Sequence, residues 1–354
     1  MSHPVEIENR KIGPGNPCLI VCEVAQAHDG SLGTAHAFVD AAAKTGADAI
    51  KFQTHIASAE STPQEPFRVK FSHQDATRYD YWKRMEFTAE QWAGLAAHAH
   101  EMGLIFLSSP FSEAAVEMLD KIGMPAWKIA SGEVNNALLM DRIYLTGKPI
   151  LLSSGMSSLE ETDRAVQDIR LHGNDFVVLQ CTSKYPSPPE NVGLNMLEVY
   201  RQRYQVPVGL SDHSGKIYPG LAAVTMGANL LEVHITLSRE MFGPDVPASL
   251  DTREMKELVE GVRFIEQTLA HPLDKQLLAK EMEGMRQIFG KGLVIKHDLK
   301  AGHRLTKSDL TAKKPAAGIP VEDIETVLGK PLRVDKRAGE FLQSDEVQRE
   351  AKDE

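Results

Sequence analysis

Long apolar runs are missing from this sequence of 354 residues. No uninterrupted apolar stretch approaches the roughly 20 residues that a membrane-crossing helix needs. Residues 1–6 contain no basic region followed by an apolar one, so we expect no secretory signal. We therefore expect no association with a membrane.

Cysteine is scarce, and its placement argues against disulfides. The three cysteines, Cys18, Cys22 and Cys181, lie within or beside apolar runs. No second close pair accompanies Cys18 and Cys22 to complete a zinc site. This pattern is typical of reduced, buried thiols, and we expect a cytoplasmic protein.

An excess of positive charge is also lacking. The chain has 39 lysines and arginines against 49 aspartates and glutamates, a net charge of −10. This balance argues against nucleic acid and against an anionic membrane surface as partners. A small anionic substrate is compatible with this balance, because a few lysines at its binding site can outweigh the net negative charge of the chain.

What the sequence does contain is a regular alternation of strand-like and helix-like segments. Apolar residues make up 42% of the chain, enough for a sizeable core. From residue 17 to about residue 235, short apolar runs that end in polar residues alternate with helical patterns. The eight runs are 18–24, 49–52, 104–107, 126–130, 150–152, 176–179, 206–210 and 230–235. The helical patterns are 33–45, 88–102, 112–122, 137–146, 158–172, 194–204, 218–226 and 251–270.

Eight such units predict an α/β fold, a (β/α)8 TIM barrel. The alternative is an open doubly wound sheet, but no glycine-rich phosphate motif follows the first run. We expect the barrel over residues 1–270, a helical linker over 271–288 and a small domain over 289–354. The long polar segment 58–86 is either a functional lid or a surface insertion.

Polar side chains at the ends of the apolar runs indicate a phosphate-binding site. In a barrel of this kind the active site lies at the carboxyl ends of the strands. The second to sixth runs supply lysines and hydroxyls, which suit a phosphate group. These residues include Lys51, Gln53, Ser109, Lys128, Ser131, Ser153, Ser183 and Tyr185. Lys51 and Lys128 interrupt apolar runs, and a lysine is costly to bury there without an anionic partner.

Two histidines end the seventh and eighth runs. His213 lies in the stretch 209–214 with Ser211 and Asp212, and His234 follows Glu232 on the next run. Two imidazoles from neighbouring strands would hold one divalent metal with positions left open for substrate. Asp212 either orients His213 or caps the next helix. The other histidines in these segments, His28, His55, His98, His100 and His172, are more simply read as hydrogen-bonding residues.

The assembled motifs resemble those of the sialic acid synthase family, the N-acetylneuraminate synthases and their legionaminic- and pseudaminic-acid relatives. The matching stretches are 23–30, 46–54, 109–111, 128–133, 153–156, 181–186, 209–214 and 232–237. The resemblance covers nearly the whole chain, and the C-terminal segment resembles the family's antifreeze-like (SAF) domain.

The resemblance implies an enzyme that condenses phosphoenolpyruvate with the open-chain form of an N-acetylated amino sugar. The products are a nonulosonic acid and phosphate. It implies that His213 and His234 bind Mn²⁺, or another divalent cation such as Mg²⁺ or Co²⁺. The residues implied around phosphoenolpyruvate are Lys51, Ser109, Lys128, Ser131, Ser153, Ser183 and Ser211. Those implied around the sugar are Glu23, Gln53, Tyr185 and Asp245. Glu23 and Glu133 are the candidate proton carriers, and Lys51 is the catalytic cation.

Two positions depart from the family pattern. Many members carry asparagine where this chain has Ser183. In the small domain, the family arginine that reaches the sugar's acyl group in the other subunit is replaced by Lys314, which keeps the charge but loses the bidentate fork. The resemblance implies a domain-swapped homodimer.

Two other functions compete with this interpretation. A metal-dependent pyruvate aldolase would not need the phosphate-facing lysines and hydroxyls. A non-catalytic sugar-binding relative would not need both histidines together with Glu23 and Glu133. The sequence does not name the acceptor, which we expect to be N-acetylmannosamine or a diacetamido-trideoxyhexose.

Overall fold

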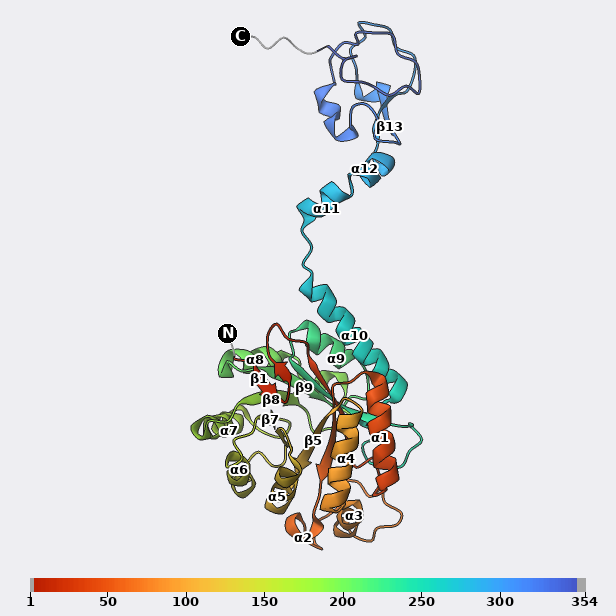
Figure 1. Ribbon diagram of the computed structural model, residues 1–354. Helices are drawn as coiled ribbons and strands as arrows, with labels where there is room; N and C mark the ends of the chain where they lie inside the picture. The colour runs from red at the N-terminus through yellow and green to blue at the C-terminus, as the bar shows by residue number, and fades with distance from the viewer. Residues whose placement is uncertain (1–2, 349–354) are drawn as a thin grey trace. The chain divides into compact units, whose positions relative to one another are not determined.

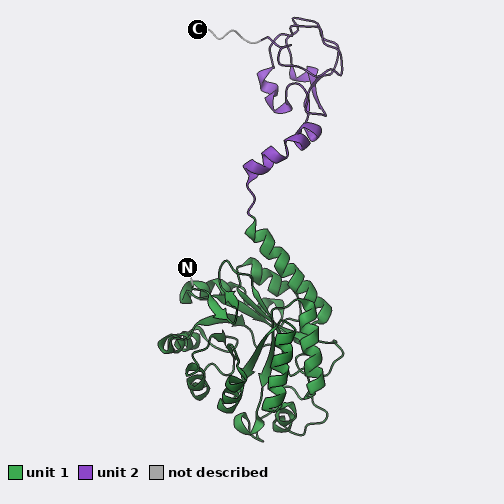
Figure 2. Ribbon diagram, in the orientation of Figure 1, with its two compact units in different colours: residues 1–271 green, residues 272–354 purple. Residues whose placement is uncertain are grey.

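The computed structural model describes residues 3–348. The chain forms two compact units that divide at His271, residues 1–271 and residues 272–354 (Figure 2). The C-terminal part of the small domain expected at 289–354 includes residues 349–354, which lie outside the described residues. Each unit is considered by itself.

The first unit is a barrel of eight parallel strands surrounded by helices (Figure 1). Its strands are β3 (Leu19–Ala25), β4 (Ala49–Thr54), β5 (Ile105–Pro110), β6 (Trp127–Ile129), β7 (Ile150–Ser153), β8 (Phe176–Cys181), β9 (Val208–Asp212) and β10 (Leu230–Thr236). They follow the order β5-β4-β3-β10-β9-β8-β7-β6, and the short strand β11 (Leu250–Asp251) pairs with β10. The (β/α)8 prediction is confirmed, and each of the eight apolar runs forms a strand.

The barrel helices also lie where the sequence pattern predicted them. They are α1 (Leu32–Thr45), α4 (Ala89–Glu101), α5 (Glu113–Ile122), α6 (Ala137–Tyr144), α7 (Leu159–His172), α8 (Asn195–Tyr204), α9 (Tyr218–Thr225) and α10 (Thr252–Ala270). Capping boxes at Thr88 and Ser158 begin α4 and α7. Left-handed glycines at Gly46, Gly123 and Gly173 end α1, α5 and α7. Local capping therefore sets the length of these helices.

An N-terminal hairpin, which the strand-helix pattern did not predict, closes one end of the barrel. Strands β1 (Val5–Ile7) and β2 (Arg10–Ile12) pair antiparallel. Val5, Ile7 and Ile12 pack against inward-facing residues near the beginnings of the barrel strands, such as Leu19 and Ile105. The hairpin thus covers the amino ends of the strands, and the carboxyl ends are left for a site.

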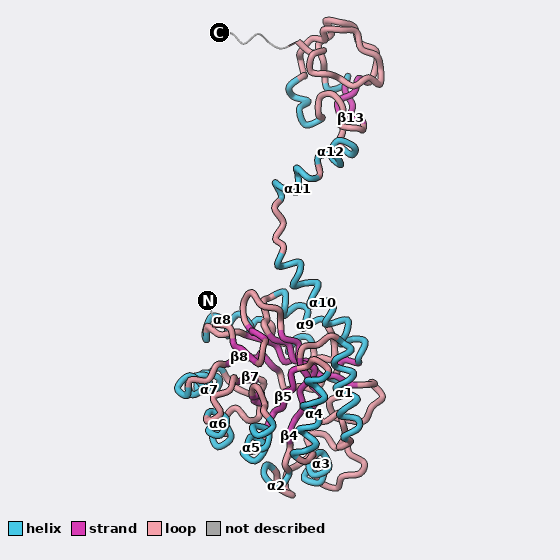
Figure 3. Tube along the Cα trace, in the orientation of Figure 1, coloured by secondary structure: helices cyan, strands magenta, loops and turns pink. Residues whose placement is uncertain are grey.

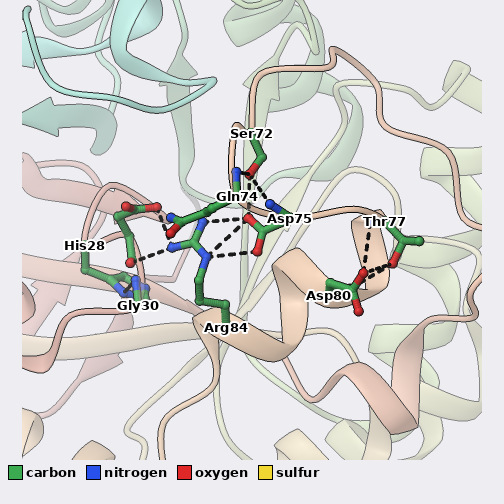
Figure 4. Close-up of polar contacts among 9 residues, drawn as sticks. His28, Gly30, Ser72, Gln74, Asp75, Thr77, Asp80 and Arg84 are labelled. Carbon is green, nitrogen blue, oxygen red and sulfur yellow. Dashed lines mark hydrogen bonds and ion pairs between the residues drawn. The ribbon is translucent and has the colours of Figure 1, made fainter.

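The segment between β4 and α4 contains two short helices, α2 (Ala57–Glu60) and α3 (Arg78–Met85), that were expected as part of a loop. Arg84 of α3 anchors this segment (Figure 4). Its Nη2 lies 2.8 Å from Asp75 Oδ2, and its Nη1 donates to the backbone and side-chain oxygens of Asp29, each at 2.8 Å. Gly30 lies against this contact with φ +76°, where an added Cβ would come within 2.3 Å of the Arg84 carbonyl oxygen.

The second unit contains little regular structure, as Figure 3 shows. Helices α11 (Lys275–Glu281) and α12 (Glu283–Phe289) precede a hairpin of β12 (Gly292–Ile295) and β13 (Leu310–Lys313). Short 3-10 turns at Lys307–Asp309 and Val321–Thr326 complete it, as others do in the first unit at Pro189–Asn191 and Val246–Ala248. Its own apolar core includes Leu293, Ile295, Leu310, Leu332 and Leu342.

Candidate active site

A single cavity of about 430 Å³ lies at the carboxyl ends of the barrel strands. It collects all but one of the residues that the sequence singled out. These are Glu23, Lys51, Gln53, Ser109, Lys128, Ser131, Glu133, Ser153, Ser183, Tyr185, Ser211, His213, His234 and Asp245. The exception, Lys314, lies exposed in the second unit, with its Nζ 4.9 Å from the centre of the Phe289 ring. All of these cavity residues except Asp245 lie on barrel strands or shortly after them, and the fold brings them into one cavity.

Lys51 is fully buried and is held by carboxylates. Its Nζ lies 2.6 Å from Glu23 Oε2 and 3.8 Å from Glu232 Oε2, and it donates to Ser109 Oγ at 3.2 Å. Gln53 Nε2 donates to the other oxygen of Glu23 at 3.1 Å. The cost of burying the ammonium group is offset by these partners.

Glu232 joins the two lysines of the cavity. Its Oε1 lies 3.1 Å from Lys128 Nζ and accepts from Ser211 Oγ at 3.0 Å. Burial acts to raise the pKa of Glu232, but the charges of Lys128 and Lys51 outweigh it and lower the pKa. Burial raises the pKa of Glu23 to about 7 in spite of Lys51. The two lysines thus favour the ionised form of Glu232, whereas burial favours the protonated form of Glu23.

Hydroxyl groups form a cradle beside the lysines. Gly155 lies among Ser131, Cys181 and Ser183, whose side-chain oxygens and sulfur would all come within 2.8 Å of an added Cβ. The Gly155 backbone N–H donates to Ser131 Oγ at 3.0 Å. Ser153 Oγ is buried and makes no hydrogen bond within residues 3–348. A buried hydroxyl without a partner is uncommon, and it indicates a group that binds there.

The two histidines lie two residues beyond Ser211 and Glu232, after β9 and on β10, and form a wall of the cavity with Tyr185. The His213 and His234 rings lie edge to face with centroids 5.1 Å apart. His213 Nδ1 lies 2.9 Å from the Thr182 carbonyl oxygen, which can only accept, so Nδ1 carries the proton and Nε2 presents its lone pair. Nε2 lies 3.0 Å from the Tyr185 hydroxyl. Asp212 does not touch the His213 ring; its carboxylate accepts from the Ser214 hydroxyl at 2.6 Å and holds the turn.

This wall fits a divalent metal with few protein ligands. Burial holds the pKa of His234 well below its usual range, so the imidazole is neutral and its lone pair is available. The Thr182 contact orients His213 as carbonyls commonly orient metal-bound histidines. Within residues 3–348, no group of three or more His, Cys, Asp and Glu side chains is arranged to hold a metal. An ion at His213 and His234 would therefore keep positions for water and substrate.

Comparisons with known proteins identify the family of this chain. The sequence pattern of the NeuB family matches residues 38–273, and that of the SAF domain matches residues 290–348. This chain belongs to the NeuB family. It is 34% identical to the N-acetylneuraminate-9-phosphate synthase of Mus musculus over 99% of each chain.

Relatives with other products match about as well. Identity to the N,N'-diacetyllegionaminic acid synthase of Campylobacter jejuni is 33%, over 88% of this chain and 95% of that one. A solved structure of the N-acetylneuraminic acid (sialic acid) synthetase from Leptospira borgpetersenii, in complex with citrate, superposes with a TM-score of 0.71. That structure is 29% identical and covers 81% of this chain and 97% of its own.

Several cavity residues of this NeuB chain escaped the sequence reasoning. Glu232 was noted on its strand but given no role, although it alternates with His234 and so faces the same side. His55, read as a hydrogen-bonding residue, does bond Glu60 at 2.5 Å but also lines the cavity. The others come from the segment between β4 and α4 or from strand ends. They include Glu60, Glu65, Arg68, Arg78, Phe111 and Cys181.

Proposed function

We propose that this enzyme condenses phosphoenolpyruvate with an N-acetylated amino sugar to give a nonulosonic acid and phosphate. One observation carries the proposal. Two buried lysines, several hydroxyls and two imidazoles line one cavity, with Glu23 and Glu133 beside them. Membership of the NeuB family supports the same reaction.

The lysines and hydroxyls suit phosphoenolpyruvate. Lys51 and Lys128 provide two positive charges for its carboxylate and phosphate, and Ser153 provides a hydroxyl that is free to donate. Ser109, Ser131, Ser183 and Ser211 stand around these groups as further donors. Held in place throughout the reaction, these donors stabilise the charge that develops on the departing phosphate.

We propose that His213 and His234 hold a divalent cation, Mn²⁺ or a similar ion such as Co²⁺ or Mg²⁺. Two imidazoles suit Mn²⁺ and Co²⁺ better than Mg²⁺, which prefers oxygen ligands. When bound, the ion supplies Lewis acidity to the sugar's carbonyl oxygen. Gln53, Tyr185 and Asp245 line the same cavity and are proposed to orient the sugar.

The bond changes need one proton carrier and one water. The C3 carbon of phosphoenolpyruvate bonds to the aldehyde carbon, and a proton must reach the new hydroxyl. Water then adds at C2 and gives up the proton that the new hydroxyl needs. The C2–O bond to phosphate breaks, the C2 hydroxyl loses its proton to the departing phosphate, and the C2 ketone remains. We propose that Glu23, whose pKa burial raises to about 7, carries a proton in this reaction. Glu133 is the second carboxyl group in reach of the cavity.

The test is turnover of phosphoenolpyruvate with a panel of amino sugars in the presence of Mn²⁺. We expect phosphate release with N-acetylmannosamine or with a diacetamido-trideoxyhexose, and loss of release after treatment with a chelator. Pyruvate in place of phosphoenolpyruvate should give no product; product from pyruvate would favour the aldolase. Absence of turnover with every acceptor would refute the proposal.

We further propose a domain-swapped homodimer in the cytoplasm. The helices α11 and α12 leave large apolar side chains uncovered within their own unit, including Leu277, Met285 and Ile288, which supports a second chain as their cover. Among residues 3–348 no helix is long and apolar enough to cross a membrane. The three cysteines are free and buried, which supports a reducing location.

A further inference from the structure

His55 lines the cavity two residues after Gln53, and its imidazole ring is held between two aromatic rings. The centres of the Trp82 and Phe111 rings lie 3.9 Å and 4.3 Å from its own. Both rings are stacked nearly parallel to it, at 16° and 18°. This stack fixes the plane of the imidazole, so its two nitrogens reach partners only at the edges of the stack.

Both ring nitrogens of His55 face oxygen atoms. Nδ1 lies 2.5 Å from Glu60 Oε1, and Nε2 lies 3.3 Å from Gln53 Oε1. Carboxylate and amide oxygens accept hydrogen bonds, so both contacts are hydrogen bonds only when each nitrogen carries a proton. The ring is then a cation beside the Glu60 carboxylate, and the faces of Trp82 and Phe111 suit a cation.

The Nε2–H group of His55 determines which way the amide of Gln53 points. Gln26 Nε2 donates to the same Gln53 Oε1 at 3.5 Å, so two donors converge on that oxygen. Gln53 Nε2 is thereby directed at Glu23, to which it donates at 3.1 Å. If the amide turned over, its NH2 group would meet the donors of His55 and Gln26, and its oxygen would meet an oxygen of Glu23.

We propose that His55 is a positioning residue for the condensation and that it acts through Gln53. Glu60 holds the ring in place, and the ring keeps the Gln53 N–H directed at Glu23. Glu23 is then held through both of its oxygens, by Gln53 on one and by Lys51 on the other. Because Gln53 and Glu23 are the groups proposed to orient the sugar and to carry a proton, this inference rests on the proposed condensation.

A purely structural role for His55 is the competing explanation. Glu60 belongs to the short helix α2, and its Oε2 accepts from the Ile56 backbone N–H at 3.3 Å. In this alternative, His55 only fastens α2 through Nδ1. The two roles use different ring nitrogens, so replacing one nitrogen at a time separates them.

The experiment compares His55→Gln with His55→Asn, following consumption of phosphoenolpyruvate with Mn²⁺ and either N-acetylmannosamine or a diacetamido-trideoxyhexose, whichever the wild type uses. The amide nitrogen of glutamine can take the place of Nε2, and that of asparagine the place of Nδ1. Both changes remove the aromatic stack. We expect His55→Asn to lower kcat/KM for the sugar about tenfold, because one positioning hydrogen bond is lost, and His55→Gln to stay within about threefold of the wild type.

The opposite order, with His55→Asn near the wild type and His55→Gln impaired, overturns the inference in favour of the fastening role, and equal losses overturn it too. Absence of turnover by the wild type with every acceptor instead refutes the condensation, and this inference falls with it. If either variant does not fold, His55→Phe keeps the stack and lacks both donors. It should lose about tenfold in kcat/KM, and wild-type turnover in His55→Phe overturns the inference.

A second background tests whether His55 acts through Gln53. In Gln53→Ala no amide is left to orient, so adding His55→Asn should lower kcat/KM by less than about twofold more. A further loss of about tenfold contradicts action through Gln53.

The matched control is His172→Asn. His172 also stacks on an aromatic ring, with centres 4.1 Å apart at Tyr144, and its Nδ1 lies 2.8 Å from the Asp168 carbonyl oxygen. It does not line the cavity, so the change should leave kcat and both KM values as in the wild type. A loss equal to that of His55→Asn would contradict the assignment to His55.

Discussion

At the scale of single residues, the buried charges of the cavity depend on one another. Glu232 contacts both Lys51 and Lys128, and each of these side chains is at most 5% exposed. Charges so deeply buried are tolerable only while they are paired. A negatively charged ligand can replace a missing carboxylate, so the stabilisation that the ligand provides is a measure of the pairing.

Replacing Glu232 with glutamine should expose this dependence. The variant keeps an acceptor for Ser211 but leaves the lysines with one carboxylate, so we expect a loss of about 3–5 kcal/mol in the free energy of unfolding. Saturating phosphoenolpyruvate should restore much of this loss, because its negative charges replace the missing one. Denaturant unfolding with and without phosphoenolpyruvate measures both quantities.

Glu117→Gln is the control, because Glu117 pairs with Arg142 at the surface. It should cost less than about 1 kcal/mol and respond to phosphoenolpyruvate as the wild type does. If phosphoenolpyruvate stabilises Glu232→Gln no more than the wild type, the counterion role is wrong.

His28 predicts how the first unit responds to acid. Burial, with smaller contributions from His55 and Arg84, lowers the pKa of His28 to about 3. In the unfolded chain the pKa of His28 is near 6.5. Below that pH the unfolded chain therefore binds a proton that the folded chain does not bind. The contribution of His28 to the free energy of unfolding is therefore fully present above about pH 6.5. It falls by about 1.4 kcal/mol per pH unit as the pH drops from there toward 3.

His28→Asn should remove this part of the pH dependence. Asparagine can accept from the Gly30 backbone N–H, as His28 Nδ1 does at 3.1 Å. Unfolding free energies measured from pH 7.5 to pH 4.5 should fall less steeply in the variant than in the wild type. Parallel curves would contradict the assignment to His28.

At the scale of elements, the barrel strands place the buried charges of the cavity, and one long segment supplies more exposed lining residues. Residues 61–77 carry Glu65 and Arg68 to the cavity, and Arg84 ties this segment to the turn after β3 (Figure 4). Strand register fixes the positions of the buried charges, whereas a few polar contacts hold residues 61–77 in place. Damage to the anchor should therefore affect the acceptor more than phosphoenolpyruvate.

Gly30→Ala tests the anchor. Its φ of +76° and the approach of the Arg84 carbonyl both oppose a Cβ, so we expect a loss of about 2–4 kcal/mol and a raised KM for the acceptor. Gly15→Ala is the matched control, since Gly15 has φ +81° but nothing within 4 Å of an added Cβ. It should cost about 1 kcal/mol and leave KM unchanged. Equal effects of the two changes on acceptor KM would argue against the anchor.

At the scale of the whole molecule, the question is whether one active site needs two chains. Lys314 belongs to the second unit, while every other singled-out site residue belongs to the barrel. In a domain-swapped dimer, each site would combine the barrel of one chain with Lys314 of the other. Mixing two defective variants separates this arrangement from a site made by one chain.

We expect His213→Ala to be inactive and Lys314→Ala to have a raised KM for the acceptor. In a mixed dimer, the intact barrel of the second variant meets the intact Lys314 of the first. Co-refolding them in equal amounts should thus restore wild-type KM in part of the population, which steady-state kinetics would detect. If the mixture shows only the sum of the separate activities, the swapped arrangement is wrong.

Much of this protein was determined by its sequence alone, for local reasons. Eight apolar runs predicted eight strands because strands buried on both faces read as continuous apolar segments. Capping residues such as Ser158 and Gly173 predicted helix ends because they satisfy the orphan groups of the nearest turn. The buried lysines and hydroxyls of the cavity followed, because parallel strands in a barrel bring their carboxyl ends together.

Tertiary structure alone decided the rest. The pairing of Glu232 with both lysines depends on three strands that are distant in sequence. Arg68 and Asp245 are 177 residues apart, and their contact depends on the path of a long segment without periodicity. The hairpin of β1 and β2 was not predicted either, because strands of three residues are too short to show a periodic pattern. Sequence patterns specify what lies on an element, whereas the contacts between elements arise only when the chain packs.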